Sequence, residues 1–161
     1  MFIAHIPVGL MLARCVTRKP LTMPIILAAG LGAMAPDFDL IRFYLFDNHL
    51  RHHHDYWTHI PAVWGLIVLA WFGISKGLKR GFGILPAVFF IAVFSHLLLD
   101  TVAGEIEWLW PFMDRGFHLV TVPASHGRWY LSFVTHWTFG IEIGLSIFAA
   151  HVAFGQRSKS A

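Results

Sequence analysis

Residues 81–100 read GFGILPAVFFIAVFSHLLLD, and no Asp, Glu, Lys or Arg occurs before Asp100 ends the stretch. An α-helix crosses the roughly 30 Å hydrocarbon core of a bilayer with about 20 apolar residues, within a range of about 17–25. We therefore predict a membrane span over residues 81–99. His96 and Asp100 stand four residues apart at one end of this span, so they share one helix face. Ionisable groups at such positions are costly in a membrane and indicate a functional site.

Three more charge-poor stretches occur, at residues 21–35, 56–75 and 129–156. The first is short but gains a turn at each end, and the other two are long enough to span. Residues 1–13 are apolar but too short to cross untilted. Basic residues follow this segment instead of preceding it, which argues against a signal peptide. The sequence therefore predicts an all-α fold: an integral membrane helical bundle of four transmembrane helices plus a short N-terminal membrane helix, in one domain over residues 1–161.

The composition excludes several other classes of protein. Of the 161 residues, 57% are hydrophobic and 13% are charged, whereas a soluble domain has about 25% charged residues. Cys15 is the only cysteine, so neither an intrachain disulfide nor a cysteine-rich zinc module can form. The net charge is +3 and no basic stripe with interleaved aromatic residues is present, so we expect no nucleic-acid partner.

The basic residues predict the orientation of the bundle. Eight of the twelve stand before the first span, between the second and third, or after the last: Arg14, Arg18, Lys19, Lys76, Lys79, Arg80, Arg157 and Lys159. Lys and Arg mark the cytoplasmic side of a membrane protein, so the loops over residues 37–55 and 101–128 face outward. Eight of the nine acidic residues lie in these loops or at their edges, and four of the seven tryptophans cluster there like an interfacial aromatic belt.

Six ionisable residues, two from each of three spans, converge on this outer face. One pair ends the span over residues 81–99. Asp37 and Asp39 follow the first span in a turn, and residues two apart in an extended segment point the same way. Thr58 is the expected N-cap of the next span, which puts His59 in the first helical turn and His54 in the loop before it.

Other polar residues lie within the apolar segments. His5 stands nine residues before Arg14, about 13.5 Å along a helix, so it reaches mid-membrane if Arg14 sits at the cytoplasmic surface; we keep it as a candidate ligand. Glu142 lies near the membrane midplane, where an ion pair or a hydrogen bond to another buried polar group is the structural alternative to a functional role. His136 and His151 are expected to be hydrogen-bonded core residues.

The candidate ligands predict a metal site. Seven imidazole and carboxylate side chains are more than one metal ion requires. Mixed nitrogen and oxygen donors suit zinc, manganese, iron or nickel better than calcium. Asp37 or Asp39 could bridge two ions, and two ions about 3.5–4 Å apart are a common device for phosphoester hydrolysis. We predict two divalent transition-metal ions, which could be zinc, manganese or iron.

Five segments occur in an order and spacing that match one family. They are His5-x3-Gly9, Pro36-Asp37-Phe38-Asp39, residues 54–59 with Thr58-His59, His96-Leu-Leu-Leu-Asp100, and Gly104 through Trp110-Pro111-Phe112. With these segments the chain resembles the YdjM-like family of bacterial and archaeal inner-membrane proteins, which are described as membrane-bound metal-dependent hydrolases. The resemblance implies a multi-pass protein of the cytoplasmic (inner) membrane. It also implies a metal site made of His5, Asp37, Asp39, His54, His59, His96 and Asp100.

One position departs from the family pattern. The family usually has arginine directly after the first histidine of its His-x4-His motif, where this chain has Asp55. Arg51, three residues before His54, is the candidate to replace that arginine. If the family arginine grips a substrate phosphate, the substrate or the rate of this protein differs from the family pattern.

The expected activity is hydrolysis of an ester or phosphoester of a lipid or amphiphile at the outer membrane face. Bound metal ions lower the pKa of a water molecule toward about 7 and so activate it. We expect Asp39 or Asp100 to take up a proton, and His118 or His126 to donate one to the leaving group. The cations expected to bind an anionic head group are Arg51, Arg115 and Arg128.

Other interpretations stay open. Histidines and acids in spans also mark ion pathways, so a non-enzymatic metal transporter or sensor is the alternative, although such a protein would carry polar residues through the full membrane depth. The metal could instead be structural and only join helices, with closed coordination and no bound water. The small residues Gly30, Gly32 and Ala33 could pack helices within one protomer or between the protomers of a homo-oligomer.

Overall fold

The computed structural model describes residues 3–46 and 53–155, and within them the fold is all-α, which confirms the predicted fold class. The long helices are α1 (His5–Thr17), α2 (Met23–Met34), α4 (Pro61–Gly77), α5 (Ile84–Asp100) and α7 (Trp137–Phe154). The short elements are the α-helices α3 (Asp39–Leu45) and α6 (Trp129–Val134) and the 3-10 helices η1 (Pro36–Phe38), η2 (His53–Asp55) and η3 (Trp57–His59). Among the described residues, one isolated antiparallel bridge joins Ile106 and Phe117.

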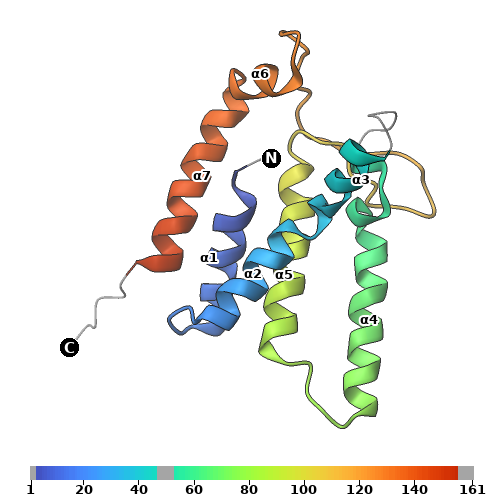
Figure 1. Ribbon diagram of the computed structural model, residues 1–161, viewed down its shortest axis with the longest axis vertical. Coiled ribbons are helices and arrows are strands. Elements are labelled where there is room, and N and C mark those ends of the chain that lie inside the picture. Colours follow the sequence, from blue (N-terminus) through green and yellow to red (C-terminus); the bar gives the residue numbers. More distant parts are fainter. Residues whose placement is uncertain (1–2, 47–52, 156–161) are drawn as a thin grey trace.

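Helix α5 lies at the centre of the bundle (Figure 1). Helices α1 and α2 pack closely along it, α7 packs on α1, and α4 contacts α5 less. The interface is made of small side chains, since Ala29, Ala33 and Ala92 are fully buried. A Cβ atom on Gly32 would collide with the carbonyl oxygen of Phe89 in α5. Gly32 and Ala33 therefore pack α2 within one protomer as predicted, which is typical of membrane bundles, whereas a Cβ atom on Gly30 would meet nothing within 4 Å.

Prolines determine where several elements begin. Pro24 and Pro61 stand in the first turn of α2 and α4, where the missing N–H has no helical partner to lose. Pro36 begins η1 directly after α2, and the chain bends by 60° between α2 and the η1–α3 segment. Ala35 keeps helical angles (φ −59°, ψ −40°). The segment that carries both carboxylates is therefore helical, and the extended turn expected from the sequence is wrong.

The described helices are shorter than the stretches predicted to span. By length and apolar composition, α7 qualifies as a span by itself, and the bent pair Met23–Met34 with Pro36–Leu45 would be a second if it counts as one span. Helices α4 and α5 have 17 residues each, about 25 Å of helix, and α1 has 13. The predicted span over residues 129–156 is divided between α6 and α7.

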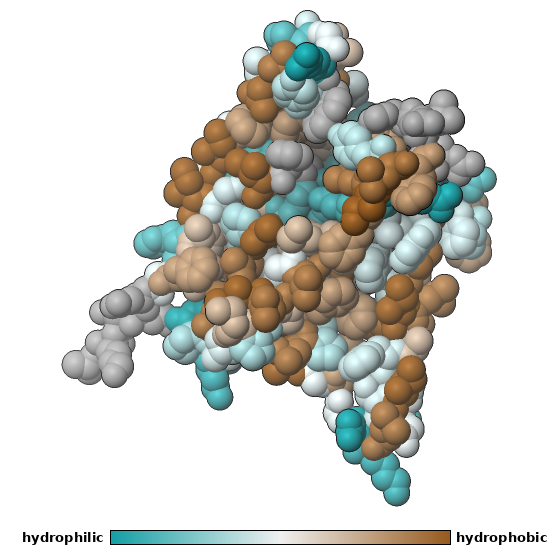
Figure 2. Space-filling view, viewed as in Figure 1, coloured by the Kyte–Doolittle hydropathy of each residue, from teal (hydrophilic) through white to brown (hydrophobic). Residues whose placement is uncertain are grey.

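Large hydrophobic side chains cover much of the outside of the bundle. Figure 2 shows them over the middle of one face, with hydrophilic side chains at its lower end and in a recess of its upper half. Leu27, Leu66, Leu69 and Ile147 are each more than half exposed. Extended exposed apolar surface marks contact with a membrane or a partner.

Candidate metal centre

Asp37, His59, His96 and Asp100 form what we call the central cluster, which η1, η3 and α5 bring together. One ligand atom of each lies within 4.8 Å of all the others. The Nε2 atom of His96 lies 2.9 Å from Asp100 Oδ2 and 3.6 Å from Asp37 Oδ1. The Nε2 atom of His59 lies 3.6 Å and 3.8 Å from the same two oxygens. Three of the four side chains are buried, while that of Asp37 is 36% exposed.

Both histidines of the central cluster are oriented through their Nδ1 atoms. The Nδ1 atom of His96 lies 2.6 Å from the carbonyl oxygen of Ala33 in α2. A carbonyl oxygen only accepts, so Nδ1 carries the proton and donates it. The Nδ1 atom of His59 donates in the same way to Asp39 Oδ2, at 2.7 Å. In a neutral ring the Nε2 atom then carries a lone pair, and both Nε2 atoms point into the central cluster.

This arrangement fits a divalent metal ion. Two imidazole lone pairs and two carboxylates in a buried site repel one another unless a cation or a proton lies between them. Nitrogen and oxygen donors of this kind suit zinc, manganese and iron. Bonds of about 2.0–2.2 Å to the ion place neighbouring ligand atoms about 2.9 Å apart at a right angle and about 3.4 Å apart at a tetrahedral angle. The four histidine–carboxylate separations run from 2.9 to 3.8 Å and all four ligand atoms lie within 4.8 Å of one another, so the four residues could hold one ion.

His5 and His54 surround the central cluster through Asp100. The Nε2 atom of His5 lies 3.0 Å from Asp100 Oδ1, and that of His54 lies 3.7 Å from Asp100 Oδ2. The His5 ring also stacks on the His96 ring, with ring centres 3.8 Å apart. His5 reaches the site because α1 begins at the end of the bundle where α5 ends (Figure 1). The carboxylate of Asp100 therefore connects all four histidines.

Asp39 holds His59 from the side opposite to the central cluster. Its Oδ2 atom accepts a hydrogen bond from the Thr58 hydroxyl, at 2.6 Å, as well as from His59 Nδ1. A carboxylate in this place fixes the tautomer and orientation of a metal-binding histidine. The prediction that Thr58 caps the following helix is wrong, because its hydroxyl bonds Asp39 while Ile60 is the N-cap of α4. His59 accordingly lies in η3 and not in the first turn of α4, which begins at Pro61.

An Asp39→Asn variant is expected to bind metal about 10–100-fold more weakly, the usual effect of losing a carboxylate behind a metal-binding histidine. A neutral amide oxygen still accepts from His59 Nδ1, but it stabilises the ring less than a carboxylate does. Zinc affinity is measured by competition with a chromophoric chelator, on untagged protein in detergent. Asp114→Asn, which changes an exposed carboxylate in the loop after α5, should leave the affinity unchanged. Equal zinc affinities of the two variants would show that Asp39 does not contribute to metal binding.

Glu142 joins α7 to the start of α1. It is fully buried, and its Oε1 atom accepts hydrogen bonds from the backbone N–H groups of Ile3 and Ala4. These groups directly precede His5, the first residue of α1, and negative charge is favoured at a helix N-terminus. The hydrogen-bonded alternative that the sequence left open for Glu142 is confirmed, and the contact helps to place His5.

Replacing Glu142 with alanine is expected to lower the free energy of unfolding by about 1.5–3 kcal/mol, the range for a hydrogen bond to a charged group. Glu142→Gln should lose less, because its amide oxygen still accepts from the start of α1. Thermal unfolding in detergent measures both, with Ile141→Ala at an exposed neighbouring position as the control. If Glu142→Ala melts no lower than this control, the contact contributes nothing to stability.

Two other histidines of the last apolar stretch differ from each other. The Nδ1 atom of His136 lies 2.9 Å from the Thr138 hydroxyl, and the residue is half-buried, which agrees with a hydrogen-bonded structural role. His151 is exposed, so its prediction as a core residue is wrong. His151 lies on the side of α7 that faces away from the bundle. The sequence does not show which side of this helix is buried, because apolar residues occur all around it.

The polar residues of the outer loops lie apart from the central cluster. Those that the structure describes are all exposed: Arg115, His118, His126 and Arg128. His118 pairs with Glu105, with 3.5 Å between Nδ1 and Oε1, and Arg128 donates to the Tyr130 hydroxyl at 2.7 Å. Within residues 3–46 and 53–155, no described contact joins any of the four to the seven candidate ligands. Arg51 lies outside the described residues, and the roles assigned to these side chains stay predictions.

Sequence reasoning missed three groups that shape the site. The carbonyl of Ala33 orients His96, but a backbone atom leaves no signal in the sequence. A Cβ atom on Gly104 would collide with the His54 ring. The signal for this close approach was a glycine four residues after Asp100, where the span ends. The Thr58 hydroxyl bonds a carboxylate, and its place beside a candidate ligand was the only indication.

One family matches the chain along almost its whole length. The family described as YdjM inner membrane protein matches residues 1–159, so the match continues beyond Phe112, where the motifs of the resemblance end. No curated protein and no solved structure matched the chain. Because the family match covers far more than half of the 161 residues, the protein belongs to the YdjM inner membrane protein family.

Proposed function

We propose that this protein is a membrane-bound metal-dependent hydrolase that cleaves an ester or phosphoester of a lipid or amphiphile. One observation carries the proposal. His96 donates from Nδ1 to the carbonyl of Ala33, so its Nε2 lone pair meets Asp100 Oδ2 at 2.9 Å. That contact needs a proton or a cation between the two atoms, and a divalent ion held there would supply an activated water and polarise a phosphoryl or carbonyl oxygen.

The exposure of the central cluster indicates how a substrate reaches it. Asp37 has a side chain that is 36% exposed, whereas the side chains of His59, His96 and Asp100 are at most 4% exposed. A substrate therefore approaches past Asp37. We also place the proton acceptor at Asp37, because its carboxylate is the exposed one, whereas Asp39 is buried and both oxygens of Asp100 face histidines.

A second ion is part of the proposal. The Oδ1 atom of Asp100 faces His5, while its Oδ2 atom faces the central cluster and His54. One oxygen of Asp100 faces His5 and the other faces the remaining three histidines, so Asp100 could serve two ions, the role that the sequence offered to Asp37 or Asp39. Two ions sharing one carboxylate are a common arrangement for phosphoester hydrolysis.

We place the metal site at the outer face of the inner membrane, with α2, α4, α5 and α7 crossing and α1 entering partway. The family is one of inner membrane proteins, and α4 and α5 fall at the lower end of the length range for spans. The turns that join α1 to α2 and α4 to α5 lie at the end of the bundle opposite to η1 and η3 (Figure 1). These turns carry basic residues, which favours the cytoplasmic side for that end.

The test is hydrolysis by untagged protein that has been stripped with a chelator and reloaded with zinc, manganese or iron. The substrates are bis(p-nitrophenyl) phosphate, a fluorogenic phospholipid and a fluorogenic acyl ester. We expect cleavage that depends on the metal, is lost in His96→Ala and is retained in Asp114→Asn. Fully loaded protein that cleaves none of them contradicts the proposal, and zinc or manganese flux into proteoliposomes would favour the transporter instead.

A further inference from the structure

An apolar groove lies beside the central cluster. Its volume is about 330 Å³, within the lower part of the roughly 300–1,000 Å³ range of ligand pockets. The apolar side chains that line it come from α2, η1, η3, α4 and α5: Leu31, Ala35, Phe38, Trp57, Trp64 and Phe89. Leu31, Phe38 and Trp57 are more than half exposed, so the groove is open to the surroundings of the bundle along these residues.

The groove and the metal site share two walls. Ala35 and Phe38 line the groove, and Asp37 lies between them in the chain, directly before Phe38 in η1. In η3, Thr58 also lines the groove, and its hydroxyl donates to Asp39. Asp37 does not itself line the groove, but its neighbours in η1 do, so the exposed carboxylate of the central cluster lies next to the groove along the chain.

Aromatic rings form one side of the groove and are held in place. The ring centre of Trp64 lies 6.4 Å from that of Trp57 and 6.2 Å from that of Phe89. The indole N–H of Trp64 donates to the carbonyl oxygen of Thr58 at 2.7 Å. The hydrogen bond ties this aromatic side to η3, so the groove is formed before any ligand arrives and keeps its position relative to the metal site.

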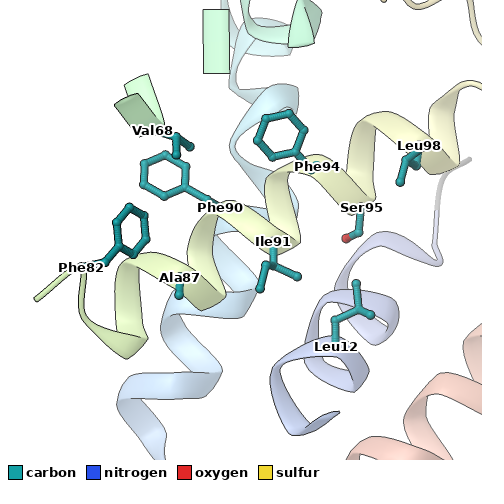
Figure 3. A pocket seen from close by; sticks show the side chains of 9 residues that line it. All are labelled: Leu12, Val68, Phe82, Ala87, Phe90, Ile91, Phe94, Ser95 and Leu98. Carbon is teal, nitrogen blue, oxygen red and sulfur yellow. The ribbon is translucent and has the colours of Figure 1, made fainter. Parts of the chain in front are cut away.

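A second apolar depression does not have this relation to the metal site. It measures about 460 Å³ and runs along α5 between α1 and α4 (Figure 3), where Leu12 faces Ile91 and Ser95. Its described lining residues include none from η1 or η3. A ligand lying there would not be led to Asp37, so the smaller groove is the better candidate for a substrate site.

We infer that the groove beside the central cluster binds one hydrocarbon chain of an anionic membrane lipid and presents the lipid head group to the metal site. This inference names the substrate class of the proposed hydrolase and rests on that proposal. A lipid fits because the family is one of inner membrane proteins and the rim of the groove is apolar and exposed. Tryptophans such as Trp57 favour the membrane–water interface, where the ester or phosphate of a lipid lies. A divalent ion complements the charge of that head group.

Photolabelling tests the inference without relying on activity. The probe is a phosphatidylglycerol with a diazirine at the end of one acyl chain, added to metal-loaded protein in detergent at no more than one probe per chain. Labelled residues are mapped by mass spectrometry. We expect the label on residues of the groove, above all in the peptides that contain Trp57, Trp64 and Phe89.

Two leucine variants on α2 provide a matched comparison. Leu31 lines the groove and Leu27 stands one turn earlier without lining it, yet they are 53% and 55% exposed. Leu31→Trp fills the groove and is expected to reduce labelling there about tenfold or more, given the usual cost of overpacking. Leu27→Trp should leave it unchanged. Metal content equal to that of the unmodified protein confirms that both variants are folded.

The outcomes separate the groove from the proposed function. Labels spread evenly over the exposed leucines of α4, or equal labelling of the two variants, would overturn the groove as the lipid site. If either of these results occurs but the loaded protein cleaves bis(p-nitrophenyl) phosphate, the hydrolase proposal holds and only the lipid groove is rejected. Groove labelling that only Leu31→Trp removes supports the inference, even if the loaded protein hydrolyses nothing and the proposed function fails.

Discussion

Replacing Asp100 with asparagine is expected to abolish stoichiometric metal binding, with an affinity more than about a hundredfold lower, because loss of a carboxylate behind a ligand already costs 10–100-fold. Asp100 is buried, and its oxygens face four histidines: His5, His54, His59 and His96. Asparagine has the same shape but no charge and a single acceptor oxygen. It can neither balance a divalent ion nor bridge two of them. Elemental analysis of untagged protein gives the number of ions per chain.

Glu107→Gln is the matched control for this experiment. Glu107 lies in the loop that follows α5, outside the central cluster. Partial burial, and then the negative charges of Asp114 and Asp55, raise the pKa of its carboxyl, so it belongs to an acidic environment without being a candidate ligand. We expect Glu107→Gln to bind as much metal as the unmodified protein. Undiminished metal in Asp100→Asn, or an equal loss in both variants, would show that the central cluster is not the metal site.

A Gly32→Ala variant should lose stability, because α2 packs closely on α5 at this position. The added Cβ atom would collide with the carbonyl oxygen of Phe89, a backbone atom that cannot rotate away. Overpacking of this kind costs about 1–3 kcal/mol and occasionally more. Helix α2 would have to move away from α5. Ala33 would then carry its carbonyl away from His96, so we expect metal affinity to fall together with the melting temperature.

Gly30→Ala introduces the same side chain on the same helix with the opposite expectation. No atom outside the local backbone lies within 4 Å of a Cβ atom at Gly30. Alanine is favoured over glycine inside a helix by about 0.5–1 kcal/mol, so this variant should melt slightly higher. Thermal unfolding of metal-free protein in detergent measures both variants. Shifts of the same sign would contradict close packing of α2 on α5 as the reason for glycine at position 32.

The meeting of six of the seven candidate ligands at one end of the bundle could be predicted from residue counting. Ionisable groups are so costly within apolar spans that the few present are informative, and helix rise assigns each to an end of its span. His96 and Asp100 followed directly from their spacing of four. His5 was harder to place, because counting from Arg14 puts it at mid-membrane, whereas the packing of α1 on α5 brings it to Asp100.

The roles within the site could not be predicted, because they depend on contacts between distant elements. The ring nitrogen that His96 offers to a metal is set by a carbonyl of α2. The Thr58 hydroxyl donates a long-range hydrogen bond to Asp39 and does not cap the helix that follows it. Hydropathy carries no information about bends, so it did not find the break before Trp137. The turn after the first span was predicted, but its helical conformation and its 60° angle were not.

The first and last candidate ligands, His5 and Asp100, stand 95 residues apart. A ribosome adding about 5–20 residues per second needs about 5–20 s to make that distance. During this time five candidate ligands have been synthesised without the carboxylate that connects all four histidines. A metal ion that needs Asp100 could therefore be held only after this residue has been synthesised.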